Sequence, residues 1–323
     1  MTRIIHGLDA VDPPFAASVL TVGNFDGVNR AHQHLLSQGA MFAAVTGHPL
    51  VALTFEPHPL TVVAPDRAPA RLTSESEKIR LLGEAGVDVV VVAHADAKLL
   101  GMTAEEFVQD VICELFHPSH LVEGPNFGFG RGRKGDNETL RRLGRELGFQ
   151  TCVVEPLKLQ VEPGQAAETV SSTLVRRLLR EGKVQQASAC LGRRYVLEGQ
   201  IGRAQQRGRS LGFPTANLQV EDQLIPAEGV YAGFAQIGPA RHSAAISIGR
   251  TPTFGENVLQ IEAHLLDFEG DLCGKTMRLE FQRWLRAQKR FESPEALIAQ
   301  IEADVACVRR FTMKGLGRLG NNG

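Results

Sequence analysis

The sequence has few cysteines and no pairing pattern among them. It holds 5 cysteines in 323 residues, an odd number, and no two of them form a CxxC motif. Neither a disulfide framework nor a zinc site is therefore indicated. Free thiols fit a reducing compartment, so a cytoplasmic location is expected. The cysteines are Cys113, Cys152, Cys190, Cys273 and Cys307.

An excess of charge and a long apolar run are also missing. Lys+Arg 35 against Asp+Glu 36 leaves a formal net charge of -1, which indicates neither a nucleic-acid partner nor general disorder. The richest apolar stretch, Val87–Ala93, is interrupted by Asp88 and falls far short of the ~18 residues of a spanning helix. Near the start, the Pro13-Pro14 pair stands where an export signal needs an apolar run. We expect a soluble protein that is neither exported nor bound to a membrane.

The length suggests two domains, at about 150 residues per domain. In the first half, short β-branched runs alternate with helical patterns, which is typical of a Rossmann-like α/β domain with a parallel sheet. Ser74 with Glu77, and Thr103 with Glu106, have the spacing of helix capping boxes. The predicted strands are Ser18–Val22, Val51–Phe55, Val87–Val92, His120–Val122 and Thr151–Val154.

The second half has a different texture. Many short strand-like stretches are punctuated by glycine, which predicts a compact antiparallel β-barrel. A helix begun by Ser293-Pro294-Glu295 follows it. Leu174–Leu191 is predicted as two helical pieces separated around Gly182. The predicted division is residues 1–182 for the α/β domain, 183–312 for the barrel with its helix, and 313–323 for a glycine-rich tail without core-forming residues, expected to be disordered.

The sharpest feature of the first half is Thr21–His32, where the first predicted strand enters a helix. In an open α/β sheet this turn brings phosphates to backbone N–H groups and the helix dipole. The spacing is not GxGxxG, so a dehydrogenase fingerprint is absent. Taken alone, His32 at a helix start is more often a surface or capping residue than a catalytic one.

Three further segments of this half have residues suited to ligand binding. For each of them, a purely structural role is the alternative. Thr54–Pro59 is either part of a ligand site or a loop stiffened by two prolines. Gly124–Asp136 joins glycines, three cations and two phenylalanines, which suits a polyphosphate and a planar ring but also a solvated hairpin. Ser171–Arg176 presents hydroxyls and an arginine, or an ordinary helix N-cap.

The second half carries a stronger constellation. Thr215 and Asn217 are two residues apart, so on an extended strand their oxygens project from one face. A hydroxyl and an amide carbonyl are hard ligands suited to Mg²⁺ that carries ATP phosphates. Glu262 lies in an alternating strand, where a carboxylate suggests a general base; a salt-bridged barrel glutamate is the alternative.

These motifs together resemble the bacterial bifunctional riboflavin kinase/FMN adenylyltransferase family. Gly23–Leu36 resembles its GNFDGVHxGHxxLL stretch, which contains the HxGH signature of nucleotidyltransferases, except that Asn29 replaces the first histidine and Ala31 the glycine. Further matches are NFxFGxxRxGD, SSTxxR, RGRxLGFPTAN, GVYA, IGxxPTF, ExHLLDFxGDLxG and LRxxxRF, with Cys273 where the family has tyrosine. The resemblance runs from about Val19 to Phe311, and agreement of this many ordered motifs is specific.

The resemblance implies an α/β nucleotidyltransferase domain that turns FMN into FAD, followed by a riboflavin kinase barrel that turns riboflavin into FMN, with ATP and Mg²⁺. It implies Glu262 and His32 as catalytic residues, and Thr215 and Asn217 as metal ligands. It implies Phe55, Phe129 and Arg286 as flavin-binding residues. The implied nucleotide-binding residues are Gly23, Asn24, Phe25, Asp26, Asn29, Asn126, Ser171, Ser172, Thr173, Arg176, Gly208 and Arg209.

Two other functions remain open from the sequence. Asn29 donates only a neutral hydrogen bond where histidine donates a charged one, and Ala31 adds a methyl group, so adenylylation is expected to be weakened or, alternatively, lost. The second alternative is a flavin-binding regulator, against which the Thr215, Asn217 and Glu262 set speaks. Small-molecule partners are expected, without nucleic acid, because only Arg203, Arg207 and Arg209 favour one. The sequence carries no signal for an oligomeric state.

Overall fold

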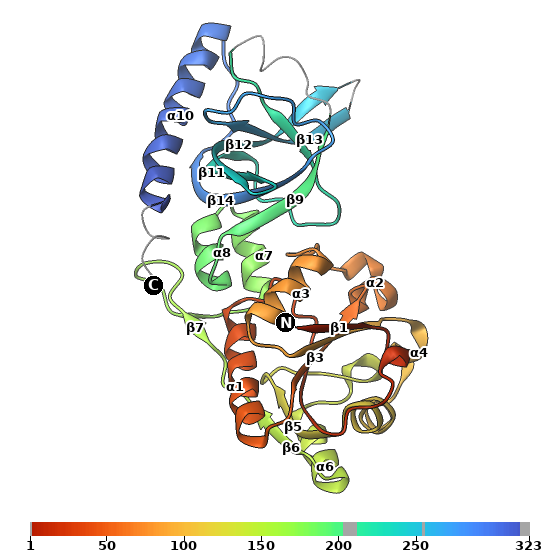
Figure 1. Ribbon diagram of the computed structural model, residues 1–323. Coiled ribbons are helices and arrows are strands. Elements are labelled where there is room, and N and C mark those ends of the chain that lie inside the picture. Colours follow the sequence, from red (N-terminus) through yellow and green to blue (C-terminus); the bar gives the residue numbers. More distant parts are fainter. Residues whose placement is uncertain (1, 203–211, 254–255, 317–323) are drawn as a thin grey trace. The chain divides into compact units, whose positions relative to one another are not determined.

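The computed structural model describes residues 2–202, 212–253 and 256–316 (Figure 1). The chain forms two compact units. The first comprises the chain up to Gln160 together with Gly164–Ser172, and the second takes in Val161–Pro163 and begins again at Thr173. None of the helices within the described ranges is both long and apolar enough to cross a membrane.

A six-stranded parallel sheet forms the centre of the first unit, with the strand order β1-β4-β3-β2-β5-β6. The five predicted strands are confirmed, β2 residue for residue and the others within two residues at each end. The sequence missed β1, which pairs with β4 at the edge of the sheet. The strands are β1 (Arg3–His6), β2 (Ser18–Val22), β3 (Leu50–Glu56), β4 (Val89–His94), β5 (Pro118–Glu123) and β6 (Gln150–Val153).

Helices and turns join the strands of this sheet, and an apolar core covers each of its faces. One core contains Leu20, Val91 and Phe116, and the other contains Val19, Leu36 and Val90. Neighbouring residues of a strand point to opposite faces of the sheet, and here both faces are buried. This explains why the strands of the sheet are nearly continuous apolar runs in the sequence. The connecting elements are η1 (Leu8–Ala10), α1 (Arg30–Thr46), α2 (Pro59–Val63), η2 (Pro65–Arg67), α3 (Glu75–Glu84), α4 (Ala97–Gly101), α5 (Ala104–Glu106), η3 (Phe107–Phe116), η4 (Arg131–Arg133) and α6 (Asn137–Leu147).

Two helices begin at the capping residues that the sequence predicts. Thr103 Oγ1 accepts the Glu106 N–H at 3.2 Å, and Glu106 Oε2 accepts the Thr103 N–H at 2.7 Å, so this capping box is reciprocal. Ser74 Oγ likewise accepts the Glu77 N–H at 3.2 Å at the start of α3. Each cap satisfies backbone donors that the first helical turn leaves unpaired.

The strand order places a topological switch point between β2 and β5. The chain leaves β2 through α1 towards β3, and leaves β5 through α6 towards β6, on opposite sides in the sheet. In open α/β sheets, ligands bind outside the carboxyl ends of the strands at such a point. The segments that follow β2 and β5 are therefore the expected walls of a ligand site in this unit.

The second unit contains a closed antiparallel barrel with the strand order β10-β13-β12-β11-β14-β9, as the sequence predicts (Figure 1). Its interior holds Tyr231, whose ring meets Phe281 edge-on at 5.2 Å between centroids and Trp284 at 5.1 Å. The strands are β9 (Tyr195–Gly202), β10 (Ala216–Gln219), β11 (Gly229–Ile237), β12 (Ala240–Thr253), β13 (Glu256–Leu265) and β14 (Thr276–Arg286).

The glycines of this half are interpreted from the sequence as punctuation between strands, and for those that lie inside strands, such as Gly199, Gly233 and Gly249, that interpretation is wrong. Gly199 lies inside β9 and Gly233 inside β11. A Cβ atom would lie 1.9 Å from the Gln219 carbonyl oxygen at Gly199, and 2.1 Å from the Glu280 carbonyl oxygen at Gly233. These glycines let neighbouring strands approach closely, as the tight closure of a small barrel requires.

Helices precede and follow the barrel. The predicted pair of helical pieces is confirmed as α7 (Ser172–Arg180) and α8 (Val184–Leu191), separated by Gly182 at φ +73°. The final helix, α10 (Pro294–Leu316), continues past residue 312, so the first residues of the predicted tail are helical, and residues 317–323 lie outside the described part. A two-stranded ribbon, β7 (Lys158–Leu159) with β8 (Glu168–Thr169), precedes α7.

The second unit begins one helix earlier than the predicted boundary at residue 182. The Ala227 N–H donates to the Leu179 carbonyl oxygen at 3.0 Å, and Lys183 pairs with Glu162 at 2.5 Å. Gly182 lies directly against the Trp284 ring, where a Cβ would approach to 2.6 Å. These contacts join α7 to the barrel and Val161–Pro163 to the start of α8, so a chain cut at Lys183 lacks part of the unit.

A chain that begins at Val161 should therefore unfold at a higher temperature than one that begins at Lys183. The shorter chain loses the Leu179 acceptor and the partner of Lys183. A lost hydrogen bond costs about 1 kcal/mol, which lowers Tm by about 4 °C in a domain of this size. Thermal unfolding of the two truncated chains by calorimetry measures the difference, and equal midpoints would return the boundary to residue 182.

Candidate active sites

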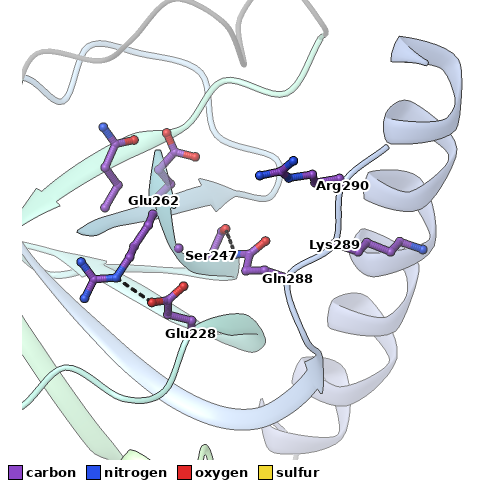
Figure 2. Close-up of a pocket in the computed structure, with 9 residues that line it drawn as sticks. Glu228, Ser247, Glu262, Gln288, Lys289 and Arg290 are labelled. Atoms are coloured by element: carbon purple, nitrogen blue, oxygen red, sulfur yellow. Dashed lines mark hydrogen bonds and ion pairs between the residues drawn. The ribbon is translucent and has the colours of Figure 1, made fainter. Parts of the chain in front are cut away.

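A polar cavity of about 460 Å³ opens in the barrel unit (Figure 2). Glu262 of β13 and Ser247 of β12 lie on its wall, and the segment after β14 supplies three more side chains. The lining residues combine carboxylates, amides and cations, which suits a charged, hydrogen-bonding ligand. They include Glu228, Ser247, Arg250, Glu262, Gln288, Lys289 and Arg290.

The barrel register brings Asn217, Glu262 and Ser247 into one row. Asn217 of β10 is paired with Glu262, and Glu262 is paired with Ser247. Directly opposite residues of antiparallel strands present their side chains on the same face. Burial raises the pKa of Glu262 above its ordinary value, which makes its carboxylate a stronger base than an exposed one. The carboxylate, the amide and the hydroxyl thus share one face of the barrel.

Thr215 lies immediately before β10, and the segment that carries it is anchored to β13. His264 Nδ1 donates to the Pro214 carbonyl oxygen at 2.9 Å, and its ring meets Phe213 edge-on. Thr215 and Asn217 are both partly exposed. Gly208 and Arg209, which the resemblance places at the nucleotide, lie outside the described residues.

Of the side chains that line the cavity, only Glu262 was singled out from the sequence. Gln288 Nε2 donates to Ser247 Oγ and to the Ile248 carbonyl oxygen, both at 2.9 Å. Arg250 pairs with Glu228, another lining residue, at 2.9 Å. The LRxxxRF match contains Gln288 and Lys289 among its unspecified positions, so the motif marked this segment without indicating those residues.

Arg286 has a different environment from the one that the resemblance implies. Its guanidinium donates to both carboxylate oxygens of Asp304 on α10, at 2.7 to 3.1 Å. Asp304 is 7% exposed. A buried, bidentate pair of this kind holds two elements together, here α10 and the end of β14. The flavin-binding role of Arg286 stays a prediction.

In the first unit, the turn after β2 lies at the switch point and is held by side chains from several elements. The Asn24 amide lies 3.2 Å from His58 Nε2. His58 Nδ1 accepts the Leu60 N–H at 3.1 Å, and Asn24 Nδ2 is the atom that lies against Nε2 of the same ring. The Asn24 Oδ1 atom is buried and has no hydrogen-bond partner among the described residues.

Asp26 holds the turn after β2 in place through hydrogen bonds with other segments. Its carboxylate accepts the Leu72 N–H at 2.9 Å and the Thr73 N–H at 3.2 Å. Its carbonyl oxygen accepts a hydrogen bond from Ser172 Oγ at 2.7 Å. The side chain predicted to contact nucleotide therefore holds the turn against the segment before α3, and its nucleotide contact stays a prediction.

Asn29 is the N-cap of α1 and is fully buried. Its Oδ1 accepts the N–H groups of Ala31 and His32 at 3.0 and 3.2 Å. Its Nδ2 donates to Ser172 Oγ at 3.3 Å. The structure thus brings Asn29, His32 and Ser172 together at the start of one helix. Among the other predicted residues, Gly23 packs against the ring of Phe25, and that ring meets His32 edge-on.

The two phenylalanines of the Gly124–Asp136 segment differ in exposure. Phe129 is 6% exposed and packs between Phe107 and Phe127, whereas Phe127 and Phe55 are half-buried beside the same core. Asn126 is exposed at the tip. A ring that stacks on a ligand needs a free face, so Phe127 suits that contact better than the predicted Phe129.

Ser171 lies in the first unit with Ser172, whereas Thr173 and Arg176 belong to the second. Arg176 is buried on α7, 7% exposed. The contacts that the SSTxxR resemblance implies for Thr173 and Arg176 at the nucleotide stay predictions.

Comparison with known proteins adds to this geometry. Residues 13–173 match the family model for FAD synthetase, and residues 191–312 match the family model for riboflavin kinase. The fold, the turn at the switch point and the polar barrel cavity, together with these matches, define an enzyme of flavin nucleotide synthesis with two modules.

Curated relatives carry both modules in the same order. The bifunctional riboflavin kinase/FMN adenylyltransferase of Escherichia coli (strain K12) is 35% identical over 312 residues, which cover 96% of this chain and 97% of that protein. The protein of the same name from Listeria monocytogenes is 32% identical over 301 residues, covering 92% and 93%. This chain belongs to the bifunctional riboflavin kinase/FMN adenylyltransferase family.

A solved structure shares the whole fold. The crystal structure described as a macrolide-efflux protein from Streptococcus pneumoniae superposes with a TM-score of 0.83 and 25% identity, and the match covers 95% of this chain and 98% of that one. A parallel-sheet module followed along the chain by a barrel module therefore occurs in a solved protein as well.

Proposed function

We propose that the protein makes FAD from riboflavin in two ATP-dependent steps. The barrel transfers the γ-phosphoryl group of ATP to the terminal ribityl hydroxyl of riboflavin, giving FMN and ADP. The parallel-sheet unit then lets the FMN phosphate attack the α-phosphorus of a second ATP, giving FAD and pyrophosphate. The two family matches on one chain are the observation that carries this proposal.

In the kinase step, Glu262 accepts the proton of the ribityl hydroxyl. Its support is the position of the carboxylate on the cavity wall and its burial, which raises its pKa. A base of raised pKa removes a hydroxyl proton more effectively than an ordinary carboxylate. Ser247, next to Glu262 in the register and held by Gln288, is suited to orient the same hydroxyl.

Thr215 and Asn217 are proposed to hold Mg²⁺ with the ATP phosphates. Their donor set fits the ion, because Mg²⁺ takes few protein oxygens and keeps phosphate and water ligands. Asn217 and Glu262 share one face of the barrel, so phosphates held there lie beside the base. When bound, Mg²⁺ neutralises phosphate charge; the protein residues orient the reactants.

Asn217→Ala should weaken the use of Mg²⁺ in the kinase step. One oxygen ligand is lost, so we expect the Mg²⁺ concentration that supports half-maximal FMN formation to rise about tenfold. Titration of FMN formation with Mg²⁺ measures this. Gln219→Ala, on the same strand but exposed, is the control. An unchanged Mg²⁺ requirement in Asn217→Ala would refute the metal role.

In the adenylylation step, backbone N–H groups of the β2–α1 turn, which carries Asn24, are proposed to hold ATP phosphates, with His32 steadying the charge that develops at the α-phosphorus. Asn126 and Arg176 are proposed to assist, as the resemblance implies. The support is the turn at the switch point and the fixed cap of α1. We propose Phe55 and Phe127 as the surface for the flavin ring, in place of the more deeply buried Phe129.

Two alternatives make different products. A kinase with an inactive adenylyltransferase module forms FMN and no FAD, and a flavin-binding regulator forms neither. Chromatographic analysis of riboflavin incubated with Mg-ATP and the full chain separates the three cases. We expect FMN first and FAD after it; absence of FMN would overturn the kinase assignment.

We also propose that the partners are the small molecules riboflavin, FMN and ATP, without nucleic acid or a membrane, and that the protein works in the cytoplasm. The balanced charge supports the first point. The five cysteines form no disulfide within the described part of the chain, which supports a reducing compartment.

A further inference from the structure

Glu123 is a buried carboxyl at the carboxyl end of β5 that no motif indicated. Its residue is 2% exposed, and it lies at the switch point between β2 and β5. An acidic side chain is almost never fully buried without a specific partner. The partner of Glu123 is a backbone amide of the neighbouring strand.

The Val22 N–H donates to Glu123 Oε1 at 2.6 Å. The paired register of β2 and β5 runs only from Ser18↔Pro118 to Leu20↔Leu121, so the backbones part before this bond. The Gly23 N–H donates to Leu53 of β3 at 3.0 Å. Because successive amides of a strand point to opposite sides, the Val22 N–H points towards β5, and the Glu123 carboxyl spans the gap that the ladder leaves.

Both walls of the adenylylation site start directly beside this bond. Gly23 and Asn24 follow Val22 on one side. On the other side, Gly124 follows Glu123, and its carbonyl oxygen accepts a hydrogen bond from Asn137 Nδ2 of α6 at 3.0 Å. The Glu123 backbone is itself held by β6, since its carbonyl oxygen accepts the Val154 N–H at 2.8 Å. One side chain therefore ties a fixed strand end to the start of the opposite loop.

Burial raises the pKa of Glu123 well above its ordinary value, and the hydrogen bond from Val22 opposes this rise only in part. Burial thus favours the neutral acid. Glutamine has the shape of that acid and keeps an Oε1 acceptor, whereas leucine fills a similar volume without any acceptor. The two substitutions separate the acceptor from the bulk of the side chain.

We propose that Glu123 is a positioning residue for adenylylation: by accepting the Val22 N–H where β2 and β5 part, it fixes the spacing between the loop that holds ATP phosphates and the loop that holds the flavin. The proposal rests on the proposed placing of ATP and flavin on these two loops. If so, the geometry of the reaction depends on a hydrogen-bond acceptor that does not itself contact a ligand.

The test measures FAD formation from FMN and ATP by the full chain and two variants. Glu123→Leu should lower kcat/KM about tenfold or more, because small displacements of reacting groups cost that much or more in rate. KM for ATP and for FMN should rise as well as kcat fall, since both loops shift. Loss of folded protein alone would lower the apparent kcat and leave KM unchanged. Glu123→Gln should stay within about threefold of the unmodified chain, because it keeps the acceptor.

Ser18→Ala is the matched control. Ser18 Oγ donates to the Phe116 carbonyl oxygen at 2.7 Å, a buried bond at the opposite end of β2. The substitution Ser18→Ala removes a comparable hydrogen bond from the same strand and leaves both loops unchanged. We expect Ser18→Ala to lower Tm and leave KM for both substrates unchanged. The proposal is overturned if Glu123→Leu keeps its KM values, if Glu123→Gln loses as much activity as Glu123→Leu, or if Ser18→Ala raises KM equally.

His32→Ala tests the proposed placing of the nucleotide separately. If that variant makes FAD normally, the placing of ATP at the β2–α1 turn is wrong whatever Glu123 does. If His32→Ala loses FAD formation while Glu123→Leu remains active with unchanged KM, the proposed nucleotide site is supported. The positioning role of Glu123 is then wrong.

Discussion

Glu262→Gln should lower the rate of FMN formation about a hundredfold or more, the usual loss when a general base is removed. Glutamine keeps the size and the hydrogen-bonding shape of the side chain, so the cavity and the barrel register should persist. The amide cannot take the proton of the ribityl hydroxyl. Single-turnover measurement of FMN formation at saturating Mg-ATP reports the loss directly.

The control for this variant is Glu228→Gln, which removes another carboxylate from the same cavity. Glu228 is paired with Arg250, so its removal should change KM more than kcat. FAD formation from added FMN should be normal in both variants, because that reaction belongs to the other module. Near-normal FMN formation by Glu262→Gln would show that another group accepts the proton.

The double change Asn29→His with Ala31→Gly should speed conversion of FMN to FAD by up to about a hundredfold. A charged hydrogen bond at the helix start stabilises the developing phosphate charge roughly twice as well as a neutral one, and one such donor is worth about 3 kcal/mol in related sites. The unmodified chain should therefore accumulate FMN and convert it slowly. A time course of both flavins, with the kinase step as internal reference, measures the ratio.

The cap of α1 sets the controls for this experiment. Asn29 Oδ1 accepts two backbone N–H groups, and a charged imidazole has no acceptor for either of them, so the double change gives up this cap. Asn29→Ala also lacks the cap, should cost about 1 kcal/mol of stability, and should slow FAD formation further. If the unmodified chain makes FAD as fast as FMN and the double change has no effect, Asn29 is an adequate substitute for histidine.

The parts of the fold that the sequence predicted are those where local pattern and burial agree. β2 was predicted residue for residue because all five of its side chains are buried between two cores. β1 was missed because it has four residues, three of them exposed, and so has no apolar pattern. It becomes a strand only through pairing with β4.

The site was predictable as a set of segments and less so as a set of contacts. Motif spacing gave Asn217 and Glu262, and the register pairs them. The direction of the Asp26 carboxylate and the burial of Phe129 depend on tertiary packing that no local pattern encodes. Glu123 gave no signal because a single glutamate at a strand end looks like a solvated residue until the parting of β2 and β5 is known.

The two modules differ in how much unpaired backbone they offer to other chains. A closed barrel has no free strand edge, whereas the parallel sheet ends in β1 on one side and β6 on the other. Free edges are the places where partly unfolded proteins join into aggregates, and natural edges are kept short and polar. Each of these two edge strands has four residues, and they carry Arg3, His6 and Gln150. When the protein is heated or concentrated, intermolecular strand pairing should therefore begin in the adenylyltransferase module. The barrel should be the half that is less prone to aggregate.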